Sequence, residues 1–329
     1  MPLKKYGVLA GKAIAARRED SDDSPHYQVH VRGGGTSYRI AVNVKSNQAP
    51  SELLYLINES FRHPILAPLR DVAEGFTPLA PKPGGLALDF IRGNLFDRAD
   101  MRLLPHNLPG PDNDLSDRIE HYIKRAIDEP DARVFAFGER WGPEQGKPDK
   151  IFKFNPGNGI HDIHMNQGNI ATYRNDDGVW QDGGLILRFP LADQWVALFL
   201  AFQSQAWHTD DTTGHAIEGV EEPDKRVRIV AALVNPVGGE PEAEAVLLLN
   251  PTPRTIDFGG WKIADRDKHK CPLSGRLPAG EAVKAKLAAP VKLGNAGGII
   301  TLLDAQGLKV DGVSYTKEQA RREGWWVVF

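Results

Sequence analysis

The sequence predicts two domains. Residues 1–224 are expected to form an α+β domain with a mixed sheet and a few helices, and residues 225–329 an all-β sandwich. The chain of 329 residues exceeds the typical domain length of about 100–200. The 33 Gly and 24 Pro make up about 17% of the chain, and this high content favours turns over long helices. After the charged linker at residues 218–224, strands recur about every ten residues, a spacing typical of a sandwich.

Composition excludes several classes of protein. The 40 Lys and Arg against 43 Asp and Glu give a net charge of −3, which excludes a basic nucleic-acid-coating protein but leaves a local basic cleft open. Cys271 is the single cysteine, so intrachain disulfides and cysteine-rich zinc sites are excluded. The longest apolar run, residues 195–202, is too short to span a membrane. Without an apolar run for a signal peptide, we expect a cytoplasmic protein, or one exported without a cleavable signal.

The first domain begins with alternating apolar residues. Strands are expected at residues 6–10, 26–31 and 38–45, the last two joined by a glycine-rich turn into a hairpin. Ser51 is expected to cap a helix over residues 52–60, and a second amphipathic helix is expected over residues 116–128. Further extended segments are expected at residues 134–137, 151–154, 159–166, 184–189 and 195–205. Ordered loops are expected at residues 62–115, around a short apolar piece at 86–91, and a polar loop at 138–150.

The second domain shows a regular series of short apolar segments separated by Asn, Pro, Gly and Asp. The expected strands are residues 227–234, 244–250, 255–258, 261–264, 282–287, 299–303 and 310–314. Trp261 follows two glycines and is expected to fill the core of the sandwich.

One segment, GIHDIHMNQGN at residues 159–169, concentrates polar side chains. If it is extended, Asp162, His164 and Asn166 share one face, while His161 and its apolar neighbours share the packed face. A buried polar ladder costs about 1–3 kcal/mol per unpaired group, which favours a functional use. The alternative is a solvated strand face followed by a turn.

The early hairpin presents a similar polar face. Its members are His26, Gln28, His30, Asn43 and Lys45, which we expect to converge with the 159–169 segment. The complete set of candidate substrate-binding residues is His26, Gln28, His30, Asn43, Lys45, Asn169, Asp182, Gln203 and Gln205. The alternative for Asp182, which lies in an Asp-Gly-Gly sequence, is a residue that shapes a turn.

Histidine, amides and a cation in one place suit phosphodiester chemistry. We therefore expect a phosphodiesterase, of which a nuclease is one form, with His164 as nucleophile or base. The candidate catalytic residues are His164, Asp162, Asn166 and His161. Nucleic acid or another phosphodiester is the expected partner, and the alternative is a non-catalytic phosphate- or carbohydrate-binding protein. The sequence contains no Walker loop, dinucleotide fingerprint or nucleophile elbow.

The cofactor is left open, with a divalent metal as one possibility. An extended His-x-x-His segment does not place both imidazoles on one side, so Asp162 with His164 is the favoured ligand pair. His208 is a further candidate ligand, and zinc and manganese both accept such groups.

Residues 1–220 resemble the YukJ-like family, a bacterial domain of unknown function. The resemblance rests on Tyr6-Gly7-Val8-Leu9, His26-Tyr27-Gln28, Asn43-Val44-Lys45-Ser46, Leu88-Asp89-Phe90-Ile91-Arg92, the 159–169 segment, Gln181-Asp182-Gly183-Gly184 and Phe202-Gln203-Ser204-Gln205. A weaker similarity is to phospholipase-D-type phosphodiesterases, whose motif is His-x-Lys with an acid four residues after the Lys. Here Asn166 replaces the Lys and Ile170 stands at the acidic position.

The second domain resembles the lamin-tail domain, an immunoglobulin-like sandwich. The resemblance rests on Leu249-Asn250-Pro251, Asp257-Phe258-Gly259-Gly260-Trp261, Asp265, Leu277-Pro278-Ala279-Gly280, Leu293-Gly294-Asn295, Leu302-Leu303-Asp304 and Val310-Asp311-Gly312-Val313-Ser314-Tyr315. Ala245 departs from the acidic residue that the family often carries. The resemblance implies docking to a protein, surface or polymer, and a purely structural cap is the alternative.

Overall fold

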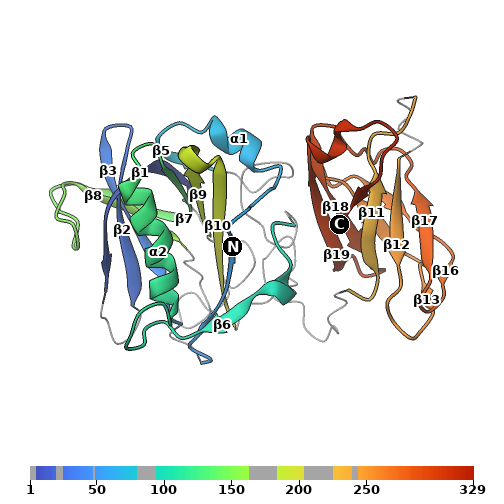
Figure 1. Cartoon of the computed structure of the whole chain (residues 1–329), viewed down its shortest axis with the longest axis horizontal. Helices are drawn as coiled ribbons and strands as arrows, with labels where there is room; N and C mark the ends of the chain where they lie inside the picture. The colour runs from blue at the N-terminus through green and yellow to red at the C-terminus, as the bar shows by residue number, and fades with distance from the viewer. Residues whose placement is uncertain are drawn as a thin grey trace. The chain divides into compact units, whose positions relative to one another are not determined.

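The computed structural model describes residues 5–19, 25–46, 49–79, 94–162, 184–203, 225–238 and 244–329. Within these ranges, one compact unit comprises residues 5–61, 69–79 and 96–203, and a second comprises residues 62–68, 94–95 and 225–329. The chain is mostly β-strand with few helices (Figure 1). The expected boundary at 224/225 follows a stretch, residues 204–224, that lies outside the described residues, so it stays a prediction.

A closed β-barrel forms the centre of the first unit. Its strands, in order around the barrel, are β1 (Tyr6–Arg18), β2 (His26–Gly33), β3 (Thr36–Asn43), β8 (Gly157–Asp162) and β7 (Arg133–Glu144). The pairing of β1 with β7 closes the ring, and β3 with β8 is the parallel pair. Closure removes the unpaired edges that an open sheet of these strands would expose.

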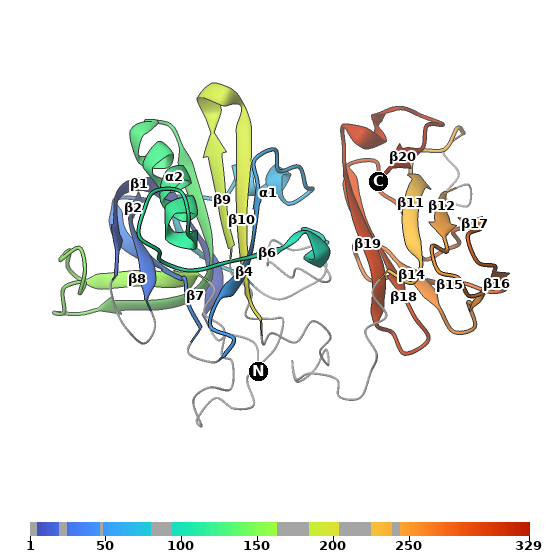
Figure 2. The same ribbon diagram turned by 60° about the horizontal axis from the view of Figure 1, so that its bottom comes forward.

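The sheet continues beyond the barrel along β7. The additional strands are β9 (Gly184–Phe189), β10 (Gln194–Phe202), β4 (Leu53–Asn58) and β6 (Arg102–Leu104), and β5 (Gly75–Pro78) pairs with β1. β8 and β9 lie end to end against β7, because Asp162 pairs with Gly138 and Gly184 with Phe137. Figure 2 shows the β7–β8 hairpin projecting from the barrel.

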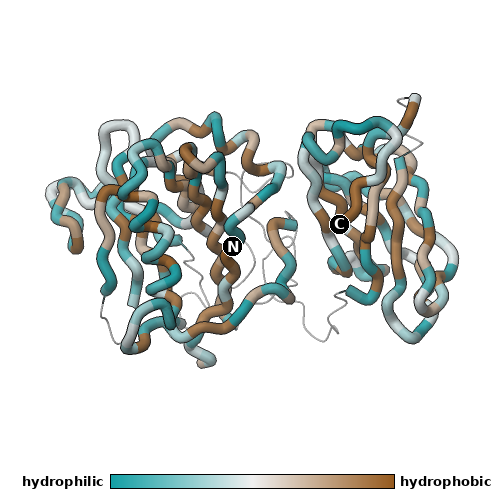
Figure 3. Tube along the Cα trace, viewed as in Figure 1, coloured by the Kyte–Doolittle hydropathy of each residue, from teal (hydrophilic) through white to brown (hydrophobic). Residues whose placement is uncertain are grey.

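The core of the first unit follows strict alternation. Tyr27, Val29 and Val31 on β2 point inward, as do Ile40 and Val42 on β3, and all five are buried. Apolar residues run along β10 and β9 in the same unit (Figure 3). The expected hairpin of alternating faces is therefore confirmed.

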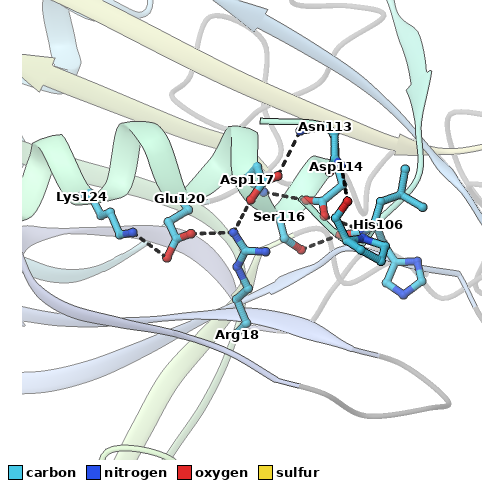
Figure 4. Close-up of polar contacts among 10 residues, drawn as sticks. Arg18, His106, Asn113, Asp114, Ser116, Asp117, Glu120 and Lys124 are labelled. Carbon is cyan, nitrogen blue, oxygen red and sulfur yellow. Dashed lines mark hydrogen bonds and ion pairs between the residues drawn. The ribbon is translucent and has the colours of Figure 1, made fainter. Parts of the chain in front are cut away.

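Helix α2 (Leu115–Asp128) packs its apolar side against this core, close to the expected range of 116–128. Strand β1 holds both ends of the helix. Arg18 pairs with Asp117 and Glu120 at the N-terminal end, each at 2.5 Å (Figure 4). Lys12 donates to carbonyls at the C-terminal end, including that of Glu129 at 2.6 Å. Acids near the start of a helix and cations near its end both complement the helix dipole.

The remaining short helices are α1 (Leu66–Arg70), η1 (Arg98–Asp100), η4 (Pro190–Ala192) and η6 (Gln319–Arg321). No helix in the described ranges combines the length and apolar character needed to cross a membrane.

Several expected elements before residue 225 were wrong, including the ordered loops at 62–115, where α1, β5, η1 and β6 form. Residues 53–58 form strand β4 instead of a helix, because Leu53, Tyr55 and Ile57 contact the core at a spacing of two while β4 pairs with β10 and β6. The expected polar loop at 138–150 is largely the second half of β7, which pairs with β8 as far as Glu144. The expected strand at 151–154 is a turn, and the apolar piece at 86–91 lies outside the described residues.

The second unit contains antiparallel sheets around one core. One sheet has the order β17-β12-β11-β20, another β15-β14-β18-β19, and β13 pairs with β16. The strands are β11 (Arg228–Leu233), β12 (Ala245–Leu249), β13 (Ile256–Asp257), β14 (Lys262–Ala264), β15 (Lys270–Pro272), β16 (Arg276–Leu277), β17 (Ala282–Lys286), β18 (Gly297–Leu303), β19 (Lys309–Thr316) and β20 (Val327–Val328). Trp261 is buried in this core, as expected, and so is Cys271.

Asn94 packs into the second unit although it lies far from it in the sequence. Its side-chain amide donates to the carbonyl of Ile300 and the hydroxyl of Thr301, both at 3.1 Å, and to the carbonyl of Val313 at 3.3 Å. A Cβ on Gly312 would lie 2.1 Å from Asn94 Oδ1, so only glycine leaves room for this side chain.

Candidate functional site

Polar side chains line the face of the barrel that points away from its core. Strand pairing places Gln28 opposite Ala41, Ala41 opposite His161, and His161 opposite Glu139. Because directly paired residues project to the same side, these four belong to one face. Strands from distant parts of the sequence therefore contribute to a single polar surface.

Three titratable side chains meet at the end of this face. The imidazole rings of His26 and His161 lie 5.7 Å apart between centroids, at an angle of 62°. Nδ1 of His26 lies 3.5 Å from the Glu19 carboxylate, and the two side chains are 15% and 21% exposed. The Glu19 amide also donates to the His26 carbonyl at 3.0 Å, which fixes the backbone beside both residues. We call Glu19, His26 and His161 the histidine cluster.

Glu19 stays ionised in this setting. Burial alone would raise its pKa, but the Gln28 hydrogen bond and the charges of Lys150 and His26 together lower the pKa below its ordinary value. The amide of Gln28 donates to Glu19 at 2.5 Å, and Lys150 Nζ lies 3.3 Å from the carboxylate. A charged carboxylate beside Nδ1 can fix the orientation of the His26 ring.

A buried ion pair between Arg39 and Asp149 is linked to the histidine cluster by hydrogen bonds. Arg39 Nε donates to Asp149 at 2.6 Å, and Arg39 Nη1 donates to Gln28 at 2.8 Å. The Arg39 and Asp149 side chains are 7% and 1% exposed, so the pair is shielded from solvent. Through Gln28 the pair reaches Glu19, which links four side chains in one continuous hydrogen-bonded chain.

An aromatic ring separates Arg39 from His161. Trp141 lies 4.8 Å from the His161 ring, and the Arg39 guanidinium lies 4.6 Å from the Trp141 ring. A Cβ on Gly159, the first residue of the 159–169 segment, would lie 2.1 Å from the Trp141 ring. This glycine therefore makes room for the tryptophan that packs against His161.

His30 shares the polar face but has a packing role. Its ring stacks against Phe152 and Phe154 with centroid distances of 5.1 and 5.0 Å, and Nε2 lies 3.1 Å from the Ser37 hydroxyl. Burial and the nearby Arg32 lower the pKa of His30. A neutral, stacked imidazole suits the packing of the 145–156 hairpin loop onto the barrel.

The expected orientation of the 159–169 segment was reversed in the part that the structure describes. Asp162 and Ile160 point to the core side, and His161 points to the polar face. Asp162 is 1% exposed. Among the described residues, no donor lies within hydrogen-bonding distance and angle of its two carboxylate oxygens. Burial raises the pKa of this carboxyl well above its ordinary range, and the Gly184 amide opposes the shift only in part.

The remaining hairpin candidates lie around the cluster or away from it. Asn43 is the strand partner of His26, so it flanks the cluster. Lys45 lies near His106, whose pKa is lowered by burial and then by the charge of Lys45. Gln203 follows β10 and donates to the Glu52 carbonyl at 2.8 Å, beside β4 and not beside the histidines.

Six predicted residues lie outside the described residues: His164, Asn166, Asn169, Asp182, Gln205 and His208. The predicted meeting of His164 with the hairpin therefore stays a prediction. Within the described ranges, no group of three or more His, Cys, Asp or Glu side chains could hold a metal ion. The predicted ligands His164 and His208 fall outside that search.

Sequence reasoning missed Glu19, Arg39, Asp149 and Trp141 as parts of the site. Arg39 lies opposite His30 in the hairpin, but its buried partner Asp149 comes from a segment 110 residues later. Trp141 was assigned to a loop, although continued alternation after Phe137 carries Glu139 and Trp141 to the same side of β7. Following that alternation would have placed Trp141 on the polar face.

Comparison with known proteins gives a family. The family DUF2278, described as "Uncharacterized conserved protein", matches residues 1–214. The "Uncharacterized protein YukJ" of Bacillus subtilis (strain 168) is 48% identical over 214 residues, which are 64% of this chain and 93% of that protein. The resemblance of the N-terminal region to YukJ-like proteins is thus confirmed, and residues 215–329 lie outside the family match. The chain belongs to the DUF2278 family.

Proposed function

We propose that the histidine cluster hydrolyses phosphodiesters, with His26 and His161 as an acid–base pair and nucleic acid as the first substrate class to test. The observation that carries the proposal is the 5.7 Å separation of the two rings beside the Glu19 carboxylate. Two imidazoles at this separation can each reach one oxygen of a phosphodiester or of an attacking water.

The roles follow from the surroundings of each ring. Glu19 lies at Nδ1 of His26 and can orient that ring toward the leaving oxygen, so we assign His26 the role of the acid. His161 packs against Trp141 and suits the base. His161 takes a proton from water as the water oxygen bonds to phosphorus. His26 gives a proton to the leaving oxygen as its bond to phosphorus breaks, so charge and protons balance.

Lys150 supplies a cation beside the cluster. Its ammonium lies 3.3 Å from Glu19, and its side chain is 63% exposed. An exposed cation there can approach the non-bridging oxygens of a bound phosphodiester and stabilise their charge. His164 and Asn166 remain in the proposal as the sequence-based nucleophile or base and its amide partner. Asp162 receives no catalytic role, because its carboxylate lies on the core side.

The test uses the full chain with RNA, plasmid DNA and a bis-aryl phosphodiester, in the presence of Mg²⁺, Mn²⁺, Zn²⁺ or a chelator. The variants are His26→Gln, His161→Gln and His164→Gln, with His121→Gln on the exposed side of α2 as the matched control. We expect cleavage to fall about 100- to 10,000-fold in His26→Gln and His161→Gln and to be unchanged in His121→Gln. Cleavage that persists in every variant contradicts the proposal, and binding without cleavage favours the phosphate- or carbohydrate-binding alternative.

We also propose that residues 225–329 form a lamin-tail-like, immunoglobulin-like sandwich that docks the enzyme to a partner. Two four-stranded antiparallel sheets around one core that includes Trp261 support this proposal. Polar residues of the motif bond to backbone groups of turns, which fits a scaffold better than a catalytic site. The test is whether residues 94–95 and 225–329 are needed for the location of the protein in cells but not for phosphodiester cleavage.

A further inference from the structure

The charge of the chain is divided unequally along the sequence. Residues 225–329 contain 16 Lys and Arg against 11 Asp and Glu, a net charge of +5. Residues 1–224 contain 24 against 32, a net charge of −8. Four of the acids in the positive part are buried, namely Glu244, Asp265, Asp304 and Asp311. Residues 225–329 therefore carry a net positive charge, although the whole chain is nearly neutral.

Exposed apolar side chains accompany this positive charge. Val237, Trp325 and Val328 are 75%, 62% and 74% exposed, and Phe329 is 39% exposed. Most of the surface of Val237, Trp325 and Val328 is therefore in contact with solvent. A group of large apolar side chains on the surface commonly marks an interaction site.

The apolar and basic residues are brought together by one sheet. Strand pairing sets Lys284 opposite Leu247, Leu247 opposite Ala231, and Ala231 opposite Val328, in a row across β17, β12, β11 and β20 (Figure 2). This row lies on the face away from the core, because the alternate residues Val246 and Leu248 are the ones buried inside.

Cations lie directly on the aromatic rings of this region. Lys284 Nζ lies 5.4 Å from the Trp326 ring, and the Arg322 guanidinium lies 4.7 Å from the Trp325 ring. Val237 joins the same group, because a Cβ on Gly324, next to Trp325, would lie 2.8 Å from the Val237 side chain. Acids among the described residues of this region include Glu323, which accepts from the Gly238 amide, and Glu318, which pairs with Arg321.

We propose that this surface, formed by Val237, Lys284, Lys286, Arg322, Trp325 and Val328, docks onto an anionic lipid bilayer. Lysine and arginine near such a membrane are attracted by its negative surface potential. Tryptophan is suited to the boundary between headgroups and acyl chains, and aliphatic side chains can insert below it. The proposal does not rest on the phosphodiesterase function, because it uses different residues in the other unit.

A bilayer fits these residues better than single-stranded nucleic acid does. Bases bind by stacking on open aromatic faces and by contacts from their phosphates to cations. Here each of the two tryptophan rings already carries a cation, at Lys284 and at Arg322. The two most exposed apolar members, Val237 and Val328, are aliphatic and give a base neither a stacking face nor a hydrogen bond.

The experiment measures co-flotation of the full chain with vesicles of phosphatidylcholine mixed with phosphatidylglycerol, and with vesicles of phosphatidylcholine alone. We expect binding to the anionic vesicles that weakens with added salt, and little binding to phosphatidylcholine alone. The double variant Lys284→Glu/Lys286→Glu should lower the affinity at least about tenfold. The double variant Val237→Ser/Val328→Ser, at two highly exposed positions, should also lower it about tenfold.

The matched control is Lys262→Glu/Lys270→Glu, which makes the same charge change on exposed positions of β14 and β15. Its affinity for anionic vesicles should stay within about threefold of that of the unmodified chain. Absence of binding to anionic vesicles at low salt overturns the proposal, as does an equal loss in the control. Binding of a fluorescent single-stranded oligonucleotide that is lost in Lys284→Glu/Lys286→Glu, without vesicle binding, overturns it in favour of nucleic acid.

Discussion

The two compact units both bury polar side chains, but they satisfy them in different ways. On the barrel, Arg39, Asp149, Gln28 and Glu19 form a chain of side-chain hydrogen bonds, and Asp149 also accepts from the amides of residues 151 and 152. In the second unit, buried polar side chains bond mainly to backbone groups. Asp265, for example, accepts from the amides of residues 267, 269 and 292.

This difference indicates that the polar groups of the second unit hold its turns, while those of the barrel surround the candidate site. Asn250 donates to the carbonyls of residues 254, 277 and 278, and Asp304 accepts from the amides of residues 306 and 308. Bonds of this kind hold turns in place, although Asp304 also pairs with Arg226 at 3.4 Å. On the barrel, side chains from several strands converge on a histidine pair, so the acid–base groups remain adjacent to one another. The chemistry is therefore expected on the barrel.

The largest stability effect is expected from the buried pair of the barrel. Arg39→Ala removes the partner of Asp149 and leaves that carboxylate buried, so the free energy of unfolding should fall by about 3–5 kcal/mol. Urea denaturation of the full chain checks this. Arg32→Ala, at an exposed position on β2, serves as the control and should change stability by less than about 0.5 kcal/mol. Equal effects of the two substitutions would show that the buried network does not stabilise the barrel.

A smaller effect is expected where Asn94 enters the second unit. Asn94→Gly removes three hydrogen bonds to β18 and β19 and should cost about 2–3 kcal/mol. Gly312→Ala should cost a similar amount, because the added Cβ meets the Asn94 side chain. In the double variant the new methyl group has room, so the two costs should not add. Additive costs in urea unfolding would contradict this packing.

Glu244 should make the stability of the second unit depend on pH. Burial, opposed by the Leu293 amide, raises the pKa of Glu244 to about 7 from an ordinary 4.5. A raised acid pKa means that the folded state holds the proton longer than the unfolded state. Stability is therefore complete below pH 4.5 and falls, by about 1–2 kcal/mol, as the pH rises to about 7.

The check is thermal unfolding of the unmodified chain and of Glu244→Gln across this range of pH. The decline assigned to Glu244 should be absent from the variant, which carries no titrating group at this position. An identical decline in both proteins would assign the pH dependence to other residues.

The smallest effect is expected at the start of α2. Asp114 caps the helix by accepting from the Asp117 amide at 2.8 Å and also accepts from the Leu108 amide at 2.7 Å (Figure 4). Asp114→Ala should lower stability by about 1 kcal/mol, and Asp114→Asn, which keeps an acceptor, by less. If Asp114→Asn costs as much as Asp114→Ala in urea unfolding, the cap is not the source of the stability.

The alternation of apolar and polar residues predicted those elements of the fold whose partners are close in sequence. The β2–β3 hairpin was expected because its strands are neighbours in sequence and alternate strictly. Residues 53–57 were misassigned, because apolar residues at 53, 54, 56 and 57 satisfy helical spacing as well as strand spacing. Pairing with β10, more than 130 residues later, makes this segment a strand. The sequence of the segment alone does not indicate that pairing.

The candidate site could be predicted only in part for the same reason. His26 and His161 were both named from the sequence, but their proximity depends on the parallel pairing of β3 with β8. Alternation correctly placed His161 and Asp162 on opposite faces, yet it could not say which face would be buried. That choice follows from barrel closure, which places Ile160 and Asp162 on the core side.

The central claim, that His26 and His161 act as one catalytic unit, is tested most directly by a kinetic double-mutant cycle. The measurement is kcat/KM for a bis-aryl phosphodiester with the full chain, His26→Gln, His161→Gln and the double variant. We predict that each single variant loses about 100- to 10,000-fold and that the double variant loses hardly more than the worse single one. Losses that multiply in the double variant, or a full chain that cleaves no phosphodiester, would contradict the account.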